Sequence, residues 1–217
     1  MEVSLPNSSY GELQRILDEL PIIRGEAPSI VFITGASGIG KSHLVDSMEE
    51  VFSHERLQYI RFDRIGVPSE DEMTRLYGSG TEWQRASTIE WVRRFVEEYA
   101  NKSLIVFEGQ YNLDFAREAC NIFNIDNFRF VVLTVSDAVM AQRLTEFRKQ
   151  PELVNDDMRN WSRFLREQGE SQNALIIDTS EGTTSQAIDS ILGEALKLVR
   201  NVVSSGSIGL ATRKRFC

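Results

Sequence analysis

The chain has 217 residues, 41% of them hydrophobic, and a net charge of -8. This length and composition suffice for one α/β core and predict a single domain. The acidic balance argues against a nucleic-acid partner held by a general basic surface. Two cysteines, Cys120 and Cys217, suit neither a disulfide framework nor a metal cluster.

We expect neither secretion nor a membrane span from the sequence pattern. The chain has no apolar run near eighteen residues and no charged-then-apolar leader. We therefore expect a cytoplasmic protein without a membrane partner, either a monomer or a homodimer.

The first third of the chain contains a helix, a strand and a glycine-rich loop. Leu13, Ile16, Leu17 and Leu20 form a helical stripe of apolar residues. Ser29 to Thr34, a short and largely β-branched run, predicts a buried strand.

The glycine-rich loop that follows is the most informative motif. Gly35 to Ser42 reads GASGIGKS and fits the pattern G-x-x-x-x-G-K-[ST]. The residues after Lys41 have apolar positions at helical spacing up to Phe52. A strand, such a loop and a helix together turn backbone N–H groups toward a phosphate, whereas a glycine-rich turn with an unrelated lysine needs neither flanking element. The predicted nucleotide-binding residues here are Gly35, Ala36, Ser37, Gly38, Ile39, Gly40, Lys41 and Ser42.

The middle of the chain continues the alternation. Leu57 to Phe62 predicts the second strand, which ends at Asp63-Arg64, and residues 65–80 predict a loop or short helix. A helix with a buried face follows, from about Ile89 to Tyr99. Trp83 and Trp91 need not lie on that face, so they are weak candidates for a pocket wall.

The remaining strands and helices complete an α/β pattern. Strands are predicted at 103–107, 128–134 and 174–178, and helices at about 112–122, 137–148, 156–168 and 188–199. Strands that alternate with helices indicate a parallel sheet with helices on both faces. We expect one domain over residues 1–203 and a mobile tail over residues 204–217.

Two acidic residues follow predicted strands, where ligands bind in such sheets. Glu108 is placed to act with Ser42 on Mg²⁺, although an acid there also suits the start of the next helix. Asp63 is placed where an acceptor hydroxyl would sit, although it could instead pair with Arg61 or Arg64. Lys41 is expected to reach the β- and γ-phosphates. Arg64, Gln110 and Tyr111 are expected to contribute to the acceptor pocket.

The layout over residues 28 to 200 resembles the P-loop kinases of nucleotides and small molecules. That group includes adenylate, shikimate, gluconate and adenylylsulfate kinases, chloramphenicol phosphotransferase and zeta toxins. The resemblance implies a three-layer fold with a five-stranded sheet in the order 2-3-1-4-5, ATP and Mg²⁺ as ligands, and an acceptor-binding acid at Asp63. Glu108-Gly109 is similar to the zeta-toxin and uridine-kinase form of that segment.

The resemblance also assigns roles near the carboxyl end of the chain. The run from Val135 to Arg143 resembles the entry to the adenylate-kinase lid. This implies that Arg143 covers the base, that Arg148 meets the phosphates, and that a lid spans about 143–168. Asp178-Thr179-Ser180 is similar to the base-flanking loop of several of these kinases. The lid departs from the adenylate-kinase pattern and offers Arg159, Arg163 and Arg166, which could contact phosphate or face solvent.

Three alternative functions are consistent with the sequence. The first is transfer of the γ-phosphate of ATP to a hydroxyl or phosphate of a small molecule or nucleotide. The second is a P-loop ATPase or regulatory nucleotide-binding protein, and the third is a zeta-toxin-like nucleotide-sugar kinase. No Asn-Lys-x-Asp motif for guanine occurs, since Asn101-Lys102 is followed by Ser103-Leu104.

Overall fold

The computed structural model describes residues 7–20 and 27–213 of the chain, with side chains from Tyr10 to Ser204 apart from that gap. Cys217 and the rest of 214–217 lie outside this part. The strands are β1 (Ser29–Thr34), β2 (Leu57–Arg61), β3 (Leu104–Glu108), β4 (Phe128–Thr134) and β5 (Leu175–Asp178). They pair in parallel in the order β2-β3-β1-β4-β5, which confirms the predicted fold class.

Eight α-helices are described around this sheet. They are α1 (Asn7–Glu19), α2 (Lys41–Val51), α3 (Glu70–Tyr77), α4 (Gly80–Glu97), α5 (Leu113–Ile122), α6 (Asp137–Gln142), α7 (Asp156–Ser171) and α8 (Thr184–Arg213). Three short turns complete the fold: the 3₁₀ turns η1 (Phe62–Ile65) and η3 (Pro151–Leu153) and the π turn η2 (Arg143–Phe147).

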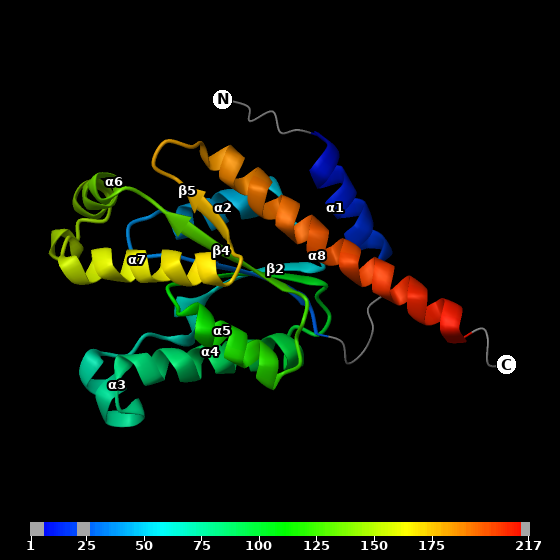
Figure 1. Ribbon diagram of the computed structural model, residues 1–217, viewed down its shortest axis with the longest axis horizontal. Helices are drawn as coiled ribbons and strands as arrows, with labels where there is room; N and C mark the ends of the chain where they lie inside the picture. The colour runs from blue at the N-terminus through cyan, green and yellow to red at the C-terminus, as the bar shows by residue number, and fades with distance from the viewer. Residues whose placement is uncertain (1–6, 21–26, 214–217) are drawn as a thin grey trace.

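The helices cover the sheet in two layers (Figure 1). On one face α1, α2 and α8 pack against the Val31 and Ile33 side of β1. On the other face α4, α5 and α7 pack against the Ile30 and Phe32 side. Because successive side chains of a strand point to opposite faces, β1 is buried along its whole length. This central strand therefore holds the following loop in a fixed position.

The element boundaries differ from the sequence prediction at two places. β2 ends at Arg61, because Phe62 to Ile65 turn into a 3₁₀ helix that carries Asp63. Helix α8 continues to Arg213, so residues 204–213 of the predicted mobile tail are helical. The mobility of that segment stays a prediction.

The two tryptophans proposed as pocket walls are core residues instead. Trp83 and Trp91 are buried in the cluster under α4. The Trp91 indole N–H donates to the Phe62 carbonyl at 2.9 Å. Both rings therefore contact Phe62 of η1 from the core.

Membrane-spanning helices are not found in this structure: over residues 7–20 and 27–213, each helix is too short or too polar to cross a bilayer.

Candidate phosphoryl-transfer site

The glycine-rich loop lies between the buried strand β1 and helix α2. Gly40 caps α2 in a left-handed conformation with φ 95°, and no side chain caps that end of the helix. A Cβ on Gly38 would lie 2.7 Å from Leu144 Cγ in η2, so the loop packs tightly against the π turn. The N–H groups at the start of α2 are thus left for a ligand, as an anion site requires.

Lys41 is a buried cation at this loop. Its side chain is 8% exposed, and its Nζ donates to the Ala36 carbonyl at 2.9 Å. Burial is the main cause that lowers the pKa of Lys41 from 10.5 to about 8. The nearby Glu108 and Asp63 carboxylates raise this pKa, and the Arg148 guanidinium lowers it further. Glu108, Asp63 and Arg148 therefore each lie within electrostatic reach of Lys41. Their joint role at a phosphate site stays a prediction.

Glu108 ends β3 on the face of the sheet that carries α2. It pairs in register with Ile33 and with Arg61, and it is 5% exposed. Burial raises the pKa of Glu108, while Lys41 lowers it and Asp63 raises it. No ion pair within 4 Å joins Lys41 to Glu108 in the described chain, so both charges remain incompletely neutralised.

A divalent cation fits the oxygen groups near Lys41. Ser42 lies exposed on the first turn of α2, and Glu108 provides a buried carboxylate. Hydroxyl and carboxylate oxygens are ligands that suit Mg²⁺, which keeps several waters and is usually held with substrate phosphates. Within residues 7–20 and 27–213, no cluster of three or more His, Cys, Asp or Glu side chains could hold a metal alone. A Mg²⁺ here would therefore arrive with a nucleotide.

Arg143 joins the segment predicted to be a lid to the phosphate loop. Its Nη1 donates to the Ile39 carbonyl at 2.9 Å and to Thr179 Oγ1 at 3.1 Å, and its Nη2 donates to the Thr179 carbonyl at 2.8 Å. Thr179 Oγ1 also donates to the Ile39 carbonyl at 3.2 Å. The π turn at Arg143 permits this geometry, and such turns often occur at functional sites.

The loop after β5 is held by its own side chains. Asp178 Oδ1 accepts from the Ser180 N–H at 2.8 Å, and Ser180 Oγ accepts from the Ser136 N–H at 2.7 Å. The three residues assigned to the base-flanking loop therefore lie beside Arg143 and the start of α6. Their contact with a base stays a prediction.

Asp63 is exposed in η1 and free of the salt bridge that was its alternative. Arg61 instead pairs with Asp46 and Glu49 on α2. Among the described residues Asp63 makes no ion pair within 4 Å, and Arg64 beside it is exposed as well. The carboxylate is therefore available on the β2 side of the phosphate site.

Gln110 and Tyr111, both assigned to the acceptor pocket, have different positions. Ser37 Oγ of the phosphate loop donates to Gln110 Oε1 at 3.1 Å. The Tyr111 side chain is fully buried, stacked on Phe107, and its hydroxyl donates toward the Phe107 carbonyl at 2.9 Å. Tyr111 is therefore a core residue, because its ring fills the space beneath β3, and the acceptor assignment is corrected for it.

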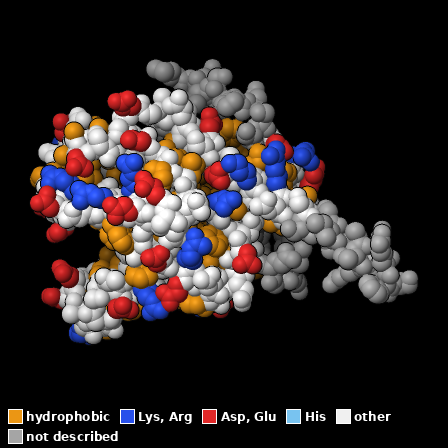
Figure 2. All heavy atoms as spheres, viewed as in Figure 1, with side chains coloured by type: hydrophobic (Ala, Val, Ile, Leu, Met, Phe, Trp, Pro, Cys, Tyr) orange, Lys and Arg blue, Asp and Glu red, His pale blue; other side chains and the backbone are white. Residues whose placement is uncertain are grey.

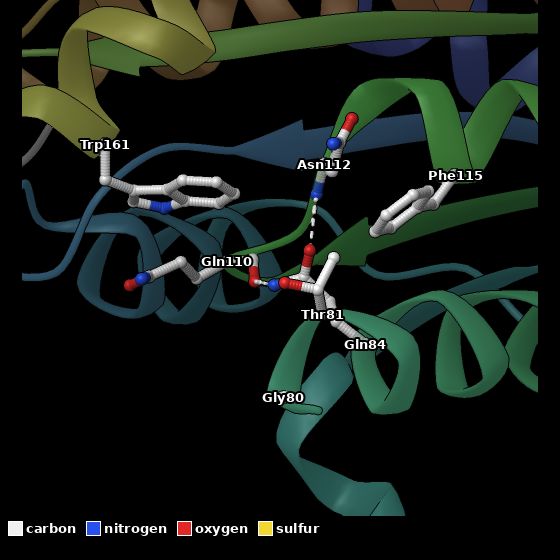
Figure 3. A pocket seen from close by; sticks show the side chains of 7 residues that line it. All are labelled: Gly80, Thr81, Gln84, Gln110, Asn112, Phe115 and Trp161. Atoms are coloured by element: carbon white, nitrogen blue, oxygen red, sulfur yellow. Dashed lines mark hydrogen bonds between the residues drawn. The ribbon is translucent and has the colours of Figure 1, made fainter. Parts of the chain in front are cut away.

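A cavity of about 360 Å³ opens beside Gln110. Its lining residues come from α4, the β3–α5 loop, α5 and α7, and are Gly80, Thr81, Gln84, Gln110, Asn112, Phe115 and Trp161 (Figure 3). The molecular surface is hollowed between the region of α6 and α7 and the region of α3 (Figure 2). The sequence did not predict Thr81, Gln84, Phe115 and Trp161 as site residues, since only the packing of α4, α5 and α7 brings them together.

The arginines of α7 are engaged mainly along their own helix, and Arg159 also lies 4.0 Å from Asp137 on α6. Arg159 pairs with Asp156, Arg166 pairs with Glu170, and Arg163 donates to Asn160. Such pairs between residues three or four apart are a usual feature of solvated helices. Of the two alternatives, contact with phosphate or exposure to solvent, these pairs favour exposure to solvent.

Comparisons with known proteins give a fold but no close relative. No protein-family model and no curated protein sequence matches the chain. A gluconokinase from Sinorhizobium meliloti 1021 aligns with a TM-score of 0.55 at 16% identity, covering 85% of this chain and 98% of its own. A shikimate kinase from Acinetobacter baumannii in complex with shikimate aligns with 0.52 at 16% identity, covering 82% and 98%.

A third solved structure aligns with a comparable TM-score. The tunicamycin resistance protein of Deinococcus radiodurans aligns with a TM-score of 0.56 at 17% identity, covering 78% of this chain and 96% of its own. At these identities the likeness shows the fold. The chain shares this fold with a gluconokinase, a shikimate kinase and the tunicamycin resistance protein.

Proposed function

We propose that this protein is a phosphotransferase that moves the γ-phosphate of ATP, with Mg²⁺, to a small-molecule acceptor. The observation that carries the proposal is the convergence of Lys41, Glu108 and Asp63 at the carboxyl ends of three neighbouring strands. A glycine loop with unpaired N–H groups completes the arrangement. Phosphoryl transfer needs positioned charge more than covalent chemistry, and this set of residues supplies it.

Each residue has a distinct task in this proposal. The loop N–H groups and Lys41 bind the β- and γ-phosphates, and Lys41 stabilises the charge that develops in transfer. Ser42 and Glu108 would hold a Mg²⁺ that arrives with the nucleotide, and its chemistry when bound would be to neutralise phosphate charge. Asp63 accepts the proton of the attacking hydroxyl and orients it in line with the phosphorus.

The lid segment contributes closure and cationic cover. Arg148 is exposed and near enough to Lys41 to lower its pKa, so a modest movement brings it to bound phosphates. Arg143 already holds the loop at Ile39 and lies beside Thr179, where a base would be received. Exclusion of water by the lid favours transfer over hydrolysis.

The proposal is tested by an ADP-release assay with saturating ATP and Mg²⁺ across nucleosides, nucleotides, sugars, antibiotics and nucleotide sugars. We expect strong stimulation by one class and a loss on the order of 10³-fold in Lys41→Ala, about 4 kcal/mol of transition-state stabilisation. Turnover that is independent of any acceptor would favour the ATPase alternative. Tight ATP binding without turnover would favour a regulatory binder.

A further inference from the structure

The cavity beside Gln110 is lined only by neutral side chains. Its seven lining residues are glycine, threonine, glutamine, asparagine, phenylalanine and tryptophan, with no Lys, Arg, Asp or Glu among them. Two cations on the helices that line the cavity are engaged elsewhere: Arg85 on α4 forms a two-point ion pair with Glu118, and Arg159 on α7 pairs with Asp156. An anionic ligand group placed here would face no free cation among the lining residues, and burying an unpaired charge is costly.

The helix end that faces the cavity is also closed to anions. Three backbone N–H groups here donate to side-chain oxygens. The Asn112 N–H donates to Gln84 Oε1 at 3.0 Å, the Leu113 N–H to Gln168 Oε1 at 3.2 Å, and the Asp114 N–H to Asn112 Oδ1 at 2.8 Å. A helix N-terminus binds phosphate through such N–H groups when they are unpaired. Here they are used up, in contrast to the start of α2 at the phosphate loop.

Hydrogen-bond donors without partners are nevertheless present. The Trp161 indole nitrogen is buried and has no hydrogen-bond partner in the described part of the chain. In Figure 3 this nitrogen lies on the edge of the ring turned toward the Gln110 side chain. An unsatisfied buried N–H carries a free-energy penalty, so a ligand oxygen that accepts from it after a small shift of the Trp161 ring gains affinity.

The polar groups around this donor are fixed in place. Gln84 donates to the Gln110 carbonyl at 3.0 Å and accepts from the Asn112 N–H, as the dashed lines in Figure 3 show. The Gln110 side chain accepts from Ser37 of the phosphate loop, which leaves its amide N–H groups for a ligand. A molecule in the cavity therefore lies directly beside the phosphate loop.

The rings of Trp161 and Phe115 give the cavity an apolar surface. Phe164 stacks on Trp161 with ring centroids 5.3 Å apart and steadies that ring. Phe115 lies on the opposite side of the cavity from Trp161 (Figure 3). Such a pairing of aromatic surface with a few neutral donors suits a ring that carries hydroxyl groups.

We propose that the phosphoryl acceptor is an uncharged, hydroxyl-bearing ring compound, such as a sugar, a cyclitol or a nucleoside. This inference rests on the proposed phosphotransferase function and narrows its acceptor class. One hydroxyl oxygen accepts from Trp161 or Gln110, and another is presented to Asp63. The Gly109 backbone lies against Phe62, the residue before Asp63, so the loop that carries Gln110 runs alongside η1.

The first experiment uses matched acceptor pairs with the full-length protein. ADP release is measured with a nucleoside and its 5′-monophosphate, an aldose and its aldonate, and a cyclitol and its carboxylated form. We expect stimulation by a neutral member that exceeds that by its anionic partner. Preference for an anionic member, or no stimulation by any neutral one while ATP still binds in calorimetry, overturns the inference and leaves the phosphotransferase proposal standing. Absence of ATP binding overturns the phosphotransferase proposal instead.

The second experiment uses variants of the cavity with the neutral acceptor so found. Trp161→Phe keeps an aromatic ring and removes the N–H, and we expect KM for the acceptor to rise about five- to tenfold, the loss of one hydrogen bond, with KM for ATP unchanged. Glu167→Gln, exposed on the same helix, is the matched control and should change neither constant. An unchanged acceptor KM in a folded Trp161→Phe protein contradicts the role of this donor.

A charge introduced at the rim provides an independent measurement. Thr81 is exposed on the first turn of α4, so Thr81→Lys adds a cation without disturbing the core, and Thr81→Met controls for size. We expect the lysine variant alone to lower KM for the anionic partner of the preferred acceptor. Equal behaviour of the two variants toward both partners would place the acceptor outside this cavity.

Discussion

Arg143 Nη1 donates to the Ile39 carbonyl at 2.9 Å, which fixes the tip of the phosphate loop to the first residue of the π turn. The same guanidinium holds Thr179 after β5. One side chain therefore connects the loop, the lid segment and the predicted base-flanking residues before any nucleotide binds. This arrangement identifies Arg143 as a residue that positions the loop, in addition to the base-covering role inferred from sequence.

Arg143→Lys should separate positioning from charge. A lysine keeps the positive charge but cannot replace the planar fork that contacts Ile39 and Thr179 together. We expect kcat/KM for ATP to fall by about 10- to 100-fold with at most ~1–2 kcal/mol of lost stability, measured by steady-state kinetics and denaturant unfolding. Thr179→Val, which removes only the hydroxyl, should have a smaller effect. Wild-type kinetics in Arg143→Lys would reduce Arg143 to a simple charge.

Lys41 should make nucleotide binding depend on pH. Its pKa of about 8 in the free protein means that much of the population is neutral above that pH. Bound phosphates favour the charged form, so binding at about pH 9 should take up a proton, and affinity should fall as pH rises through about 8. Calorimetry in two buffers of different ionisation enthalpy measures the uptake. Lys41→Ala is the control, and equal uptake in both proteins would assign the proton to another group.

Glu108→Gln should raise stability while it lowers activity. Burial raises the pKa of Glu108, so the wild-type protein loses stability as pH rises from the usual carboxyl pKa through the folded value. The variant avoids that loss, so its Tm should exceed that of the wild type near pH 7, with the difference shrinking as pH falls toward about 4.5. Its kcat should fall and its Mg²⁺ requirement should rise. Glu50→Gln, exposed on α2, is the control. An unaltered Mg²⁺ dependence would indicate that Glu108 does not act on the metal.

Asp63→Asn should affect transfer and spare ATP binding. Asp63 makes no ion pair within the described chain, so the substitution removes a proton acceptor rather than a salt bridge. We expect transfer to fall by ~10²–10⁴-fold with ATP affinity nearly intact, measured by single-turnover kinetics and calorimetry. Asp71→Asn on the exposed surface of α3 should behave as wild type. Full activity of Asp63→Asn would remove Asp63 from the reaction.

Gly109→Ala tests the packing that holds η1 beside the phosphate site. A Cβ at Gly109 would lie 2.4 Å from Phe62 Cβ and 2.9 Å from Tyr111 Cδ1. We expect a loss of about 1–3 kcal/mol in unfolding free energy. Gly193→Ala in α8 meets no atom within 4 Å and should instead stabilise the protein by about 0.5–1 kcal/mol. If Gly109→Ala is neutral as well, the contact with Phe62 is looser than the structure indicates.

The sequence determined the order of elements and the phosphate loop, because both depend on local signals. Ser29 to Thr34 is largely apolar and β-branched, which favours a strand. Gly40 adopts a left-handed backbone conformation that other residue types rarely adopt. The resemblance then implied the strand order, which the sheet confirms. Glu108 and Asp63 could be predicted as site candidates from the sequence as well, since ligands bind beyond the carboxyl ends of parallel strands.

Only the tertiary structure decided which neighbouring side chains face a ligand and which fill the core. Gln110 and Tyr111 are adjacent in sequence, yet one contacts the phosphate loop and the other is buried against Phe107. The same holds for the tryptophans: Trp91 supports η1 from the core, whereas Trp161 lines the cavity. These outcomes depend on how α4, α5 and α7 pack against one face of the sheet, and long-range packing of this kind leaves no periodic signal in the chain.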